Sequence, residues 1–295
     1  MVAASDRAFG PSRLKAVLIL ERRFRVHLVM RDRLVYDTRF SARAKGGLIP
    51  RLYFVIRGNV QIAGGEVLKA GRAYVLADNE FEAVAEGAPT FRTWGEPSVV
   101  LDLLLRPEDI RAPIGLANGP VALGEATWAT VHAMTDALAK DGSIEPFVPT
   151  LLDQLAVDGA IGANLSGTIA PAPEQLTRLW TGLRPLYTNQ MVSASIFDLT
   201  KLTGMSIRQL ARDIKLLTKT FGLPGEGFRD TTKVMRLRTA AILLSSPGAT
   251  ATEVAQQVGY NSLEAMGRAF RDAKMPAPSV VQQQVAFETM PATAR

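Results

Sequence analysis

The chain of 295 residues contains no cysteine and only two histidines, His27 and His132. The absence of cysteine excludes disulfide bonds, thiolate zinc sites and a cysteine nucleophile, and it suits a reducing compartment. A metal-binding β-barrel needs two or three imidazoles on its strands, and only His27 lies in a strand-like segment. We therefore expect a cytoplasmic protein without a metal centre.

Long apolar runs are also missing. The longest run near the N-terminus, Ala16–Leu20, is too short for a signal-peptide core and is followed by charged residues. No stretch approaches the roughly 18 apolar residues that a membrane helix needs, so we expect no membrane partner. Gly64-Gly65 resembles a hairpin turn rather than a phosphate loop, and Ser166-Gly167 lacks the G-x-S-x-G frame. These absences predict no catalytic residues, no cofactor and no enzymatic activity.

What is present is an ordinary globular composition, with 47% apolar and 21% charged residues. The length predicts two domains. Of the net charge of +6, most lies near the C-terminus: residues 191–280 hold 12 Lys and Arg against 7 Asp and Glu, whereas residues 1–190 hold 21 against 20. An excess of this size is ordinary for a domain by itself, and it supports a phosphate-binding surface only together with other features.

The first hundred residues alternate between short apolar runs and turn residues, which include Gly58-Asn59 and Gly95-Glu96-Pro97. Many short strands at such spacing predict a small barrel or sandwich. Residues 66–76 loosely resemble a cupin-type hairpin. The expected strands are Lys15–Leu20, Arg25–Met30, Leu34–Phe40, Arg51–Arg57, Val60–Ala63, Ala73–Leu76 and Val99–Leu105.

After Pro107 the pattern changes to apolar residues three and four positions apart, which predicts amphipathic helices over residues 124–140, 149–163 and 173–189. Residues 166–173 are the best candidate for a linker. From about residue 174 the chain is predicted to be helical, and it ends in a polar tail after Val285.

Two stretches near the C-terminus share one plan: a helix, a glycine turn and a second helix that opens with a serine. In the first stretch, Ile196–Thr203 is the scaffold helix, with Ile196, Leu199 and Leu202 expected to point inward. Gly204 supplies the left-handed turn. Ser206 caps the second helix, and Gln209 completes a capping box. The second helix is expected to bury Ile207, Leu210, Ile214 and Leu217 and to expose Arg208, Arg212, Lys215 and Lys219.

The second stretch repeats the plan. Thr250 and Glu253 form a capping box, Gly259 turns the chain, and Ser262 caps the next helix. Between the two stretches, residues 228–244 are predicted to form one helix of roughly 25 Å. A helix, a glycine turn and a capped helix with Arg on its outer face are the plan of a helix-turn-helix motif that reads DNA. Such a strut would hold two of these reading helices near successive major grooves, which lie about 34 Å apart.

Residues 183–284 resemble the C-terminal DNA-binding domain of the AraC/XylS family of bacterial transcription regulators. The resemblance implies an α+β chain with a β-rich, cupin-like regulatory or dimerisation domain and trailing helices over residues 1–172. Residues 174–284 would form an all-α domain with two helix-turn-helix motifs, and residues 285–295 the polar tail.

The chain departs from the family near Met275, where the family usually has glycine, and at Val280–Gln282. The matching segments are Ser206…Leu210…Arg212, Met235–Ala240, Glu253–Tyr260 and Arg268–Arg271.

By position, the resemblance places base contacts on two sets of residues. The first helix offers Arg208, Ala211 and Arg212, and the second offers Leu263, Glu264, Gly267 and Arg268; Lys215, on the outer face of the first helix, is a further DNA-binding candidate. The second set is poor in hydrogen-bonding side chains, so we expect direct readout mainly by the first motif and backbone or shape readout by the second. The implied partners are double-stranded DNA and a second copy of the chain, with a small-molecule effector and RNA polymerase as further candidates.

Aromatic residues of the β-rich part are candidates for a ligand pocket, although aromatics at these spacings are more often plain core. The ligand-binding candidates are Tyr53, Tyr74, Phe91 and Trp94. An acidic cluster at Asp78, Glu80, Glu82 and Glu86 is expected to be a solvated loop.

Two other functions stay open. The chain is alternatively a cupin-type small-molecule binding protein or enzyme with a helical appendage, and the scarcity of histidine speaks against the enzyme. It is alternatively a helical adaptor that kept the fold without binding DNA, which the weak second reading helix would allow.

Overall fold

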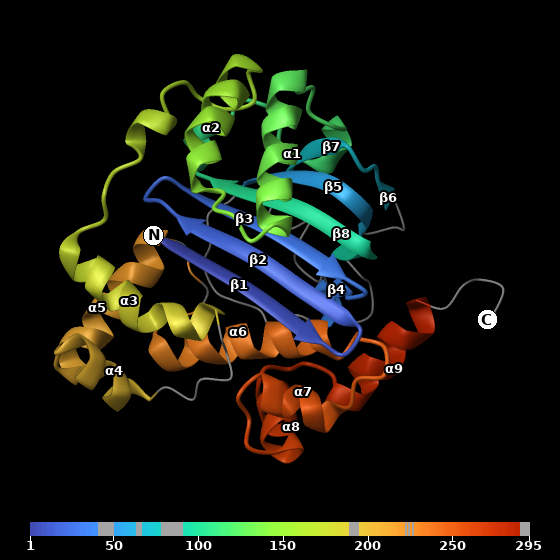
Figure 1. The fold of residues 1–295 in the computed structure, drawn as a ribbon, viewed down its shortest axis with the longest axis vertical. Helices are drawn as coiled ribbons and strands as arrows, with labels where there is room; N and C mark the ends of the chain where they lie inside the picture. Colours follow the sequence, from blue (N-terminus) through green and yellow to red (C-terminus); the bar gives the residue numbers. More distant parts are fainter. Residues whose placement is uncertain are drawn as a thin grey trace.

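The computed structural model describes residues 1–40, 50–62, 67–77, 91–188, 195–221, 223, 225 and 227–289. The fold has three layers, with an eight-stranded antiparallel sheet between two groups of helices (Figure 1). Two helices cover one face of the sheet, and the C-terminal helices lie against the other. The expected α+β class, with strands first and helices after, is confirmed.

The sheet runs in the order β1-β2-β3-β8-β5-β6, with β4 paired to β8 and β7 paired to β5. The described strands thus lead from β1 at one end to β6 at the other, and a cupin-like barrel or sandwich closed on itself is not seen in them. The strands are β1 (Val2–Phe9), β2 (Ser12–Leu20), β3 (Phe24–Asp32), β4 (Tyr36–Asp37), β5 (Arg51–Ile62), β6 (Val67–Leu68), β7 (Arg72–Leu76) and β8 (Phe91–Leu105).

Two expected turns lie inside strands instead. Gly58 lies within β5 and Gly95 within β8. Both are near a shift in the register of this strand pair, where the two backbones approach each other closely. A Cβ on Gly58 would lie 2.8 Å from the Cβ of Ser98, and one on Gly95 would lie 3.0 Å from the Cα of Gly58. Both glycines therefore permit a bulge in one continuous pair of strands.

Residues 67–76 do not form the cupin-type hairpin. In that segment, β6 and β7 both pair with β5. The two strands therefore extend the sheet beside β5 and are not the two arms of one hairpin. Strand β1 was not expected at all, because its sequence has few of the β-branched and aromatic residues that mark strands.

One face of the sheet is apolar and is covered by α1 (Glu125–Ala139) and α2 (Val148–Val157). Phe24, Val26 and Leu28 on β3 point to this side and are fully buried. Lys15 ties α1 to the sheet, since its ammonium donates to Ala139 O at 3.0 Å and pairs with Asp141 at 2.8 Å. This cation at the helix C-terminus matches the negative end of the helix dipole.

The other face is covered by the C-terminal helices, which begin after an irregular segment that contains the expected linker. They are α3 (Glu174–Thr188), α4 (Ile196–Thr203), α5 (Ile207–Phe221), α6 (Phe228–Leu243), α7 (Ala251–Gln257), α8 (Leu263–Asp272) and α9 (Pro278–Thr289). Helix α9 continues to Thr289, so the first part of the expected polar tail is helical, and Val285 is buried.

Helix α6 lies along the sheet, with α4 and α5 near one end and α7 and α8 near the other (Figure 1). Hydrogen bonds fasten the helices to the strands: the indole of Trp180 donates to Val2 O at 3.1 Å, and Ser246 Oγ donates to Ser12 Oγ at 2.8 Å. Leu20 of β2 is buried in the same apolar cluster as α3 to α5. The sheet and the C-terminal helices therefore pack against each other through buried side chains and hydrogen bonds.

Candidate nucleic-acid interface and interdomain cavity

The first helix-turn-helix motif consists of α4 and α5. Ser195 caps α4 in a reciprocal capping box with Asp198. Gly204 ends that helix at φ 70°, the left-handed conformation that glycine adopts without strain. The Gln209 backbone N–H donates to Ser206 Oγ at 3.3 Å, so the expected serine cap opens α5.

The core of this motif differs from the expected one at two positions. Leu202 is 65% exposed and Ile207 is 44% exposed, so neither points inward as expected. Helix α4 instead packs on α3 through Leu199 and Thr203, which lie close to Gly182. Residues four positions apart share one face of a helix, so Leu199 and Thr203 both face α3. Leu202 lies at the edge of this contact.

The outer face of α5 carries the predicted cations. Arg208, Ala211, Arg212 and Lys215 are all exposed, at spacings that place them along one side of the helix. The Arg212 side chain is 72% exposed, and its Nε donates to Asp213 Oδ1 at 3.1 Å. Asp213 is buried and also accepts a hydrogen bond from Gln175 of α3. This chain of contacts holds Arg212 at the surface in a defined orientation.

The second motif consists of α7 and α8. Thr250 and Glu253 form the complete capping box expected from the sequence, Gly259 has φ 78°, and Ser262 Oγ accepts from the Ala265 N–H at 3.2 Å. Leu263, Glu264 and Arg268 are exposed, and Gly267 is half-buried. The surface of α8 thus offers fewer hydrogen-bond donors than that of α5.

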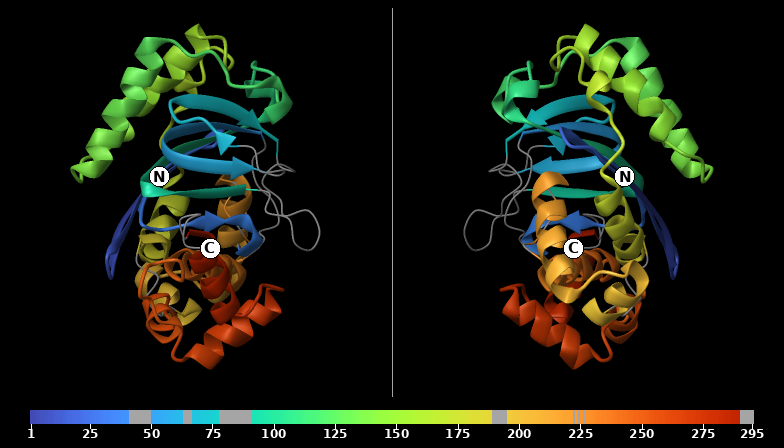
Figure 2. Two further views of the ribbon diagram at one scale, coloured as in Figure 1. Left: turned by 90° about the vertical axis from the view of Figure 1, so that its right-hand side faces the viewer. Right: turned by 90° about the vertical axis from the view of Figure 1, so that its left-hand side faces the viewer.

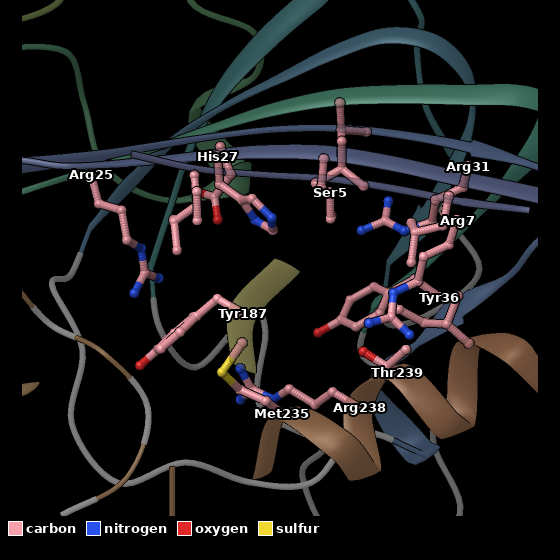
Figure 3. A pocket seen from close by; sticks show the side chains of 18 of the residues that line it. Ser5, Arg7, Arg25, His27, Arg31, Tyr36, Tyr187, Met235, Arg238 and Thr239 are labelled. Atoms are coloured by element: carbon pink, nitrogen blue, oxygen red, sulfur yellow. The ribbon is translucent and has the colours of Figure 1, made fainter. Parts of the chain in front are cut away.

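A cavity of about 260 Å³ lies between the sheet and α6. Its floor follows from strand register. Side chains at every second position of β3 face it, and direct partners on neighbouring strands face the same way. Figure 3 shows residues of the sheet on one side of this space and Met235, Arg238 and Thr239 of α6 on the other.

The floor consists of rows of residues across the sheet. One row joins Arg25 and Arg51 through Leu104, and the next joins His27, Asp102 and Tyr53. A row of small and apolar residues follows, from Ser5 through Ala16 and Val29 to Val100. The last row joins Arg7 and Arg31 through Leu14.

The cavity is strongly cationic. Five arginines are among the lining residues that the structure describes, and Asp102 supplies the one carboxylate of that set. The Asp102 Oδ2 lies 3.0 Å from Arg51 Nη1. Burial, reinforced by the charges of Arg25, Arg31, Arg51 and Arg238, lowers the pKa of His27 to about 3. Burial also lowers the pKa of Arg25 to about 10, and Arg51 adds to the shift. His27 is therefore neutral at physiological pH, while Arg25 stays charged.

Of the three predicted ligand-binding aromatics whose side chains the structure describes, Tyr53 is the one that lines this cavity. Tyr53 lies on its floor, and burial raises the pKa of its hydroxyl. Tyr74 pairs with Tyr53 across the sheet but lies one strand farther out, where its hydroxyl accepts from the Lys69 N–H at 3.2 Å. Trp94 is half-buried, with the Arg92 guanidinium 5.2 Å from its ring centre. Phe91 opens β8, and its side chain lies outside the described residues, as do Asp78, Glu80, Glu82 and Glu86.

The cavity-lining arginines were not predicted as site residues. The pattern Arg25, His27, Val29, Arg31 at two-residue steps on β3 could have shown them to share one face. Their partners come from other strands and from α6, which one-dimensional spacing does not join. Within the described residues no cluster of three potential metal ligands occurs, and none of the helices there has the length and apolar character that a bilayer crossing requires.

The two motifs lie on the side of the sheet opposite α1 and α2 (Figure 2). A family model for a helix-turn-helix domain matches residues 199–284, which span both motifs and the connecting α6. No curated protein matches the chain.

Solved structures with distant likeness include two of ToxT from Vibrio cholerae. An apo variant of ToxT is 10% identical, with 88% of this chain and 97% of that chain covered at a TM-score of 0.34. Wild-type ToxT bound to an unsaturated fatty acid is 12% identical, with 90% and 96% covered at 0.31. The AraC-like transcriptional activator CuxR is 12% identical, with 81% and 85% covered at 0.29. On the family match, residues 199–284 of this chain are a helix-turn-helix domain of the AraC type.

Proposed function

We propose that the chain is a sequence-specific DNA-binding transcription regulator in which α5 and α8 enter successive major grooves. The observation that carries this proposal is the doubled motif on either side of α6, in which each second helix begins at a serine cap and leaves its outer face exposed. A capped helix N-terminus and a row of cations favour contact with a phosphate-lined groove. The proposed contacts are Arg208, Ala211, Arg212 and Lys215 on α5 and Leu263, Glu264, Gly267 and Arg268 on α8.

The length of α6 bears on the geometry of binding. Its 16 residues span roughly 24 Å, less than the roughly 34 Å between successive major grooves on one face of the duplex. Two motifs held by a strut of this length favour DNA that bends toward the protein. We therefore expect part of the sequence preference at base pairs that no side chain touches.

The sheet domain is proposed to regulate the helical domain. Helix α6 lines the cavity with Met235, Arg238 and Thr239, and it also supplies buried residues to the core of the second motif. A small molecule bound in the cavity would thus contact the element that joins the two motifs. We also propose that the protein acts as a homodimer through residues 120–172 and that RNA polymerase is a further partner.

Selection of DNA from a random pool, followed by fluorescence anisotropy on the full chain, tests the proposal. We expect Arg208→Ala to weaken binding by about 1–3 kcal/mol and to relax preference at one base position. The matched control is Arg178→Ala, an exposed arginine on α3 that pairs at 3.8 Å with Glu174, which is also exposed; it should bind as the wild type does.

Methylation interference on a selected site tests the role of both motifs. Two protected major-groove segments about 10 base pairs apart are expected for each protomer. One segment would show that the second motif is structural, and failure to enrich any sequence would contradict the proposed function.

A further inference from the structure

The outer face of α5 and its buried face meet at two neighbouring residues, Arg212 and Asp213. Asp213 lies on the core face with Leu210 and Leu217, three and four positions away, and its side chain is 1% exposed. A carboxylate among apolar residues is costly unless its oxygens accept hydrogen bonds. Both oxygens do so, because Gln175 Nε2 donates to Oδ2 and Arg212 Nε donates to Oδ1 at 3.1 Å.

The contact between Arg212 and Asp213 fixes a direction more than it adds stability. The Arg212 side chain is largely exposed, so water weakens the pair, and burial of the carboxylate offsets part of the remaining gain. Neighbouring residues of a helix do not face each other, so Arg212 reaches Asp213 only by bending its side chain toward the carboxylate. The contact therefore selects one arrangement of a long side chain that would otherwise sample many in water.

The anchored guanidinium presents a defined set of donors. A guanidinium is planar, and its five N–H donors have fixed directions. With Nε engaged by Asp213, Nη1 and Nη2 of Arg212 remain, and among the residues that the structure describes neither has a hydrogen-bond partner. In the major groove guanine offers two acceptors, O6 and N7, that match a pair of arginine N–H groups. The end of the Arg212 side chain is thus prepared for a guanine.

Gln175 brings a further helix into this arrangement. It is the second residue of α3, which precedes the residues 199–284 that match the helix-turn-helix model. Helix α3 contacts both α5 and β1 (Figure 1), and its Trp180 indole donates to Val2 O at 3.1 Å. The position of the Asp213 carboxylate therefore depends on how α3 docks as well as on α5.

We propose that Asp213, held in place by Gln175, is a positioning residue that makes Arg212 specific for a guanine. The inference rests on the proposed DNA-binding function and deepens it, because it names the base that Arg212 reads. Asp213 is buried and does not itself reach the duplex. Its loss should therefore change base preference through Arg212 alone.

Selection of DNA from a random pool by the full chain first identifies the position whose base preference is lost in Arg212→Ala. The wild type should prefer guanine there. Replacement of that guanine by 7-deazaguanine, which lacks the N7 acceptor, should weaken wild-type binding about fivefold or more in fluorescence anisotropy. Asp213→Ala should lower the preference for guanine over the other bases about fivefold or more.

The same change in the Arg212→Ala background separates positioning from a structural role. Asp213→Ala should there have no effect on base preference, because the residue through which it acts is gone. A carboxylate that only stabilised the fold would weaken binding to all sequences alike, and it would do so in both backgrounds. Gln175→Ala repeats the test if circular dichroism shows that Asp213→Ala is unfolded, since Gln175 is exposed and its loss should lower the guanine preference in the same direction.

The control is Glu174→Ala, which removes a carboxylate from the neighbouring, fully solvated position of α3 and should leave the preference unchanged. The inference is overturned if the wild type does not prefer guanine at the Arg212 position, if both Asp213→Ala and Gln175→Ala keep that preference, or if the effect of Asp213→Ala persists without Arg212. Failure of the wild type to enrich any sequence contradicts the DNA-binding function itself and removes the basis of the inference, so the two failures are distinguishable.

Discussion

Acidification should destabilise the protein through His27. Burial and four nearby arginines lower the pKa of His27 to about 3 in the folded protein, compared with 6.5 in the unfolded chain. Because the folded-state pKa is the lower one, the unfolded chain takes up the proton first. The stability that neutral His27 contributes is therefore complete above about pH 6.5 and is lost as the pH falls toward 3. At about 1.4 kcal/mol per pH unit, roughly 2 kcal/mol is lost by about pH 5.

Urea unfolding at about pH 7.5 and about pH 5 measures this loss, and the two histidines of the chain supply the control. His27→Gln should lose roughly 2 kcal/mol less than the wild type between the two pH values. His132→Gln, on the exposed surface of α1, should keep the wild-type pH dependence. Equal pH dependence in the wild type and His27→Gln would refute the reasoning, as would an NMR titration in which the His27 ring takes up a proton near pH 6.5.

Three further changes are expected to act on the helical domain. Arg212→Ala should weaken binding to a selected operator by about 1–3 kcal/mol in fluorescence anisotropy, and an unchanged sequence preference would show that α5 is misassigned. Thr250→Ala removes the capping box of α7 and should lower the free energy of unfolding by about 1 kcal/mol, measured with urea; no loss would mean that the cap is not formed in solution. Ala240→Pro interrupts α6 at a fully buried position and should cost about 3 kcal/mol or more, with loss of helical circular dichroism. A variant that keeps wild-type stability would be incompatible with a continuous strut.

The helical domain could be predicted from the sequence almost completely, because its determinants are local. The caps at Ser206, Thr250 and Ser262 and the turns at Gly204 and Gly259 are set by residues within one helical turn of each other. The error at Leu202 comes from the packing of α3 on α4, where Leu199 and Thr203 take the buried positions, and no spacing within α4 reveals that contact.

The sheet was predicted less well, because its geometry depends on residues far apart in the chain. Gly58 and Gly95 look like turns in isolation, and only their contact across β5 and β8 shows that they form a bulge. The cavity is harder still. The alternation on β3 places Arg25 and Arg31 on one face, but the rows are completed by β1 and β5, and Arg238 of α6 completes the far wall.

The position of α6 over the arginine-bearing face has a consequence for synthesis of the protein. The strands that carry Arg25 and Arg31 leave the ribosome roughly 200 residues before α6, an interval of about 10–40 s at 5–20 residues per second. During that interval the face beneath α6 has no helical cover, and its guanidinium groups are open to ribosomal RNA and other polyanions. The nascent chain therefore emerges with a temporary cationic surface, and completion of the C-terminal helices removes it. Translation speed between α2 and α6 would thus influence how much of the protein reaches the native state.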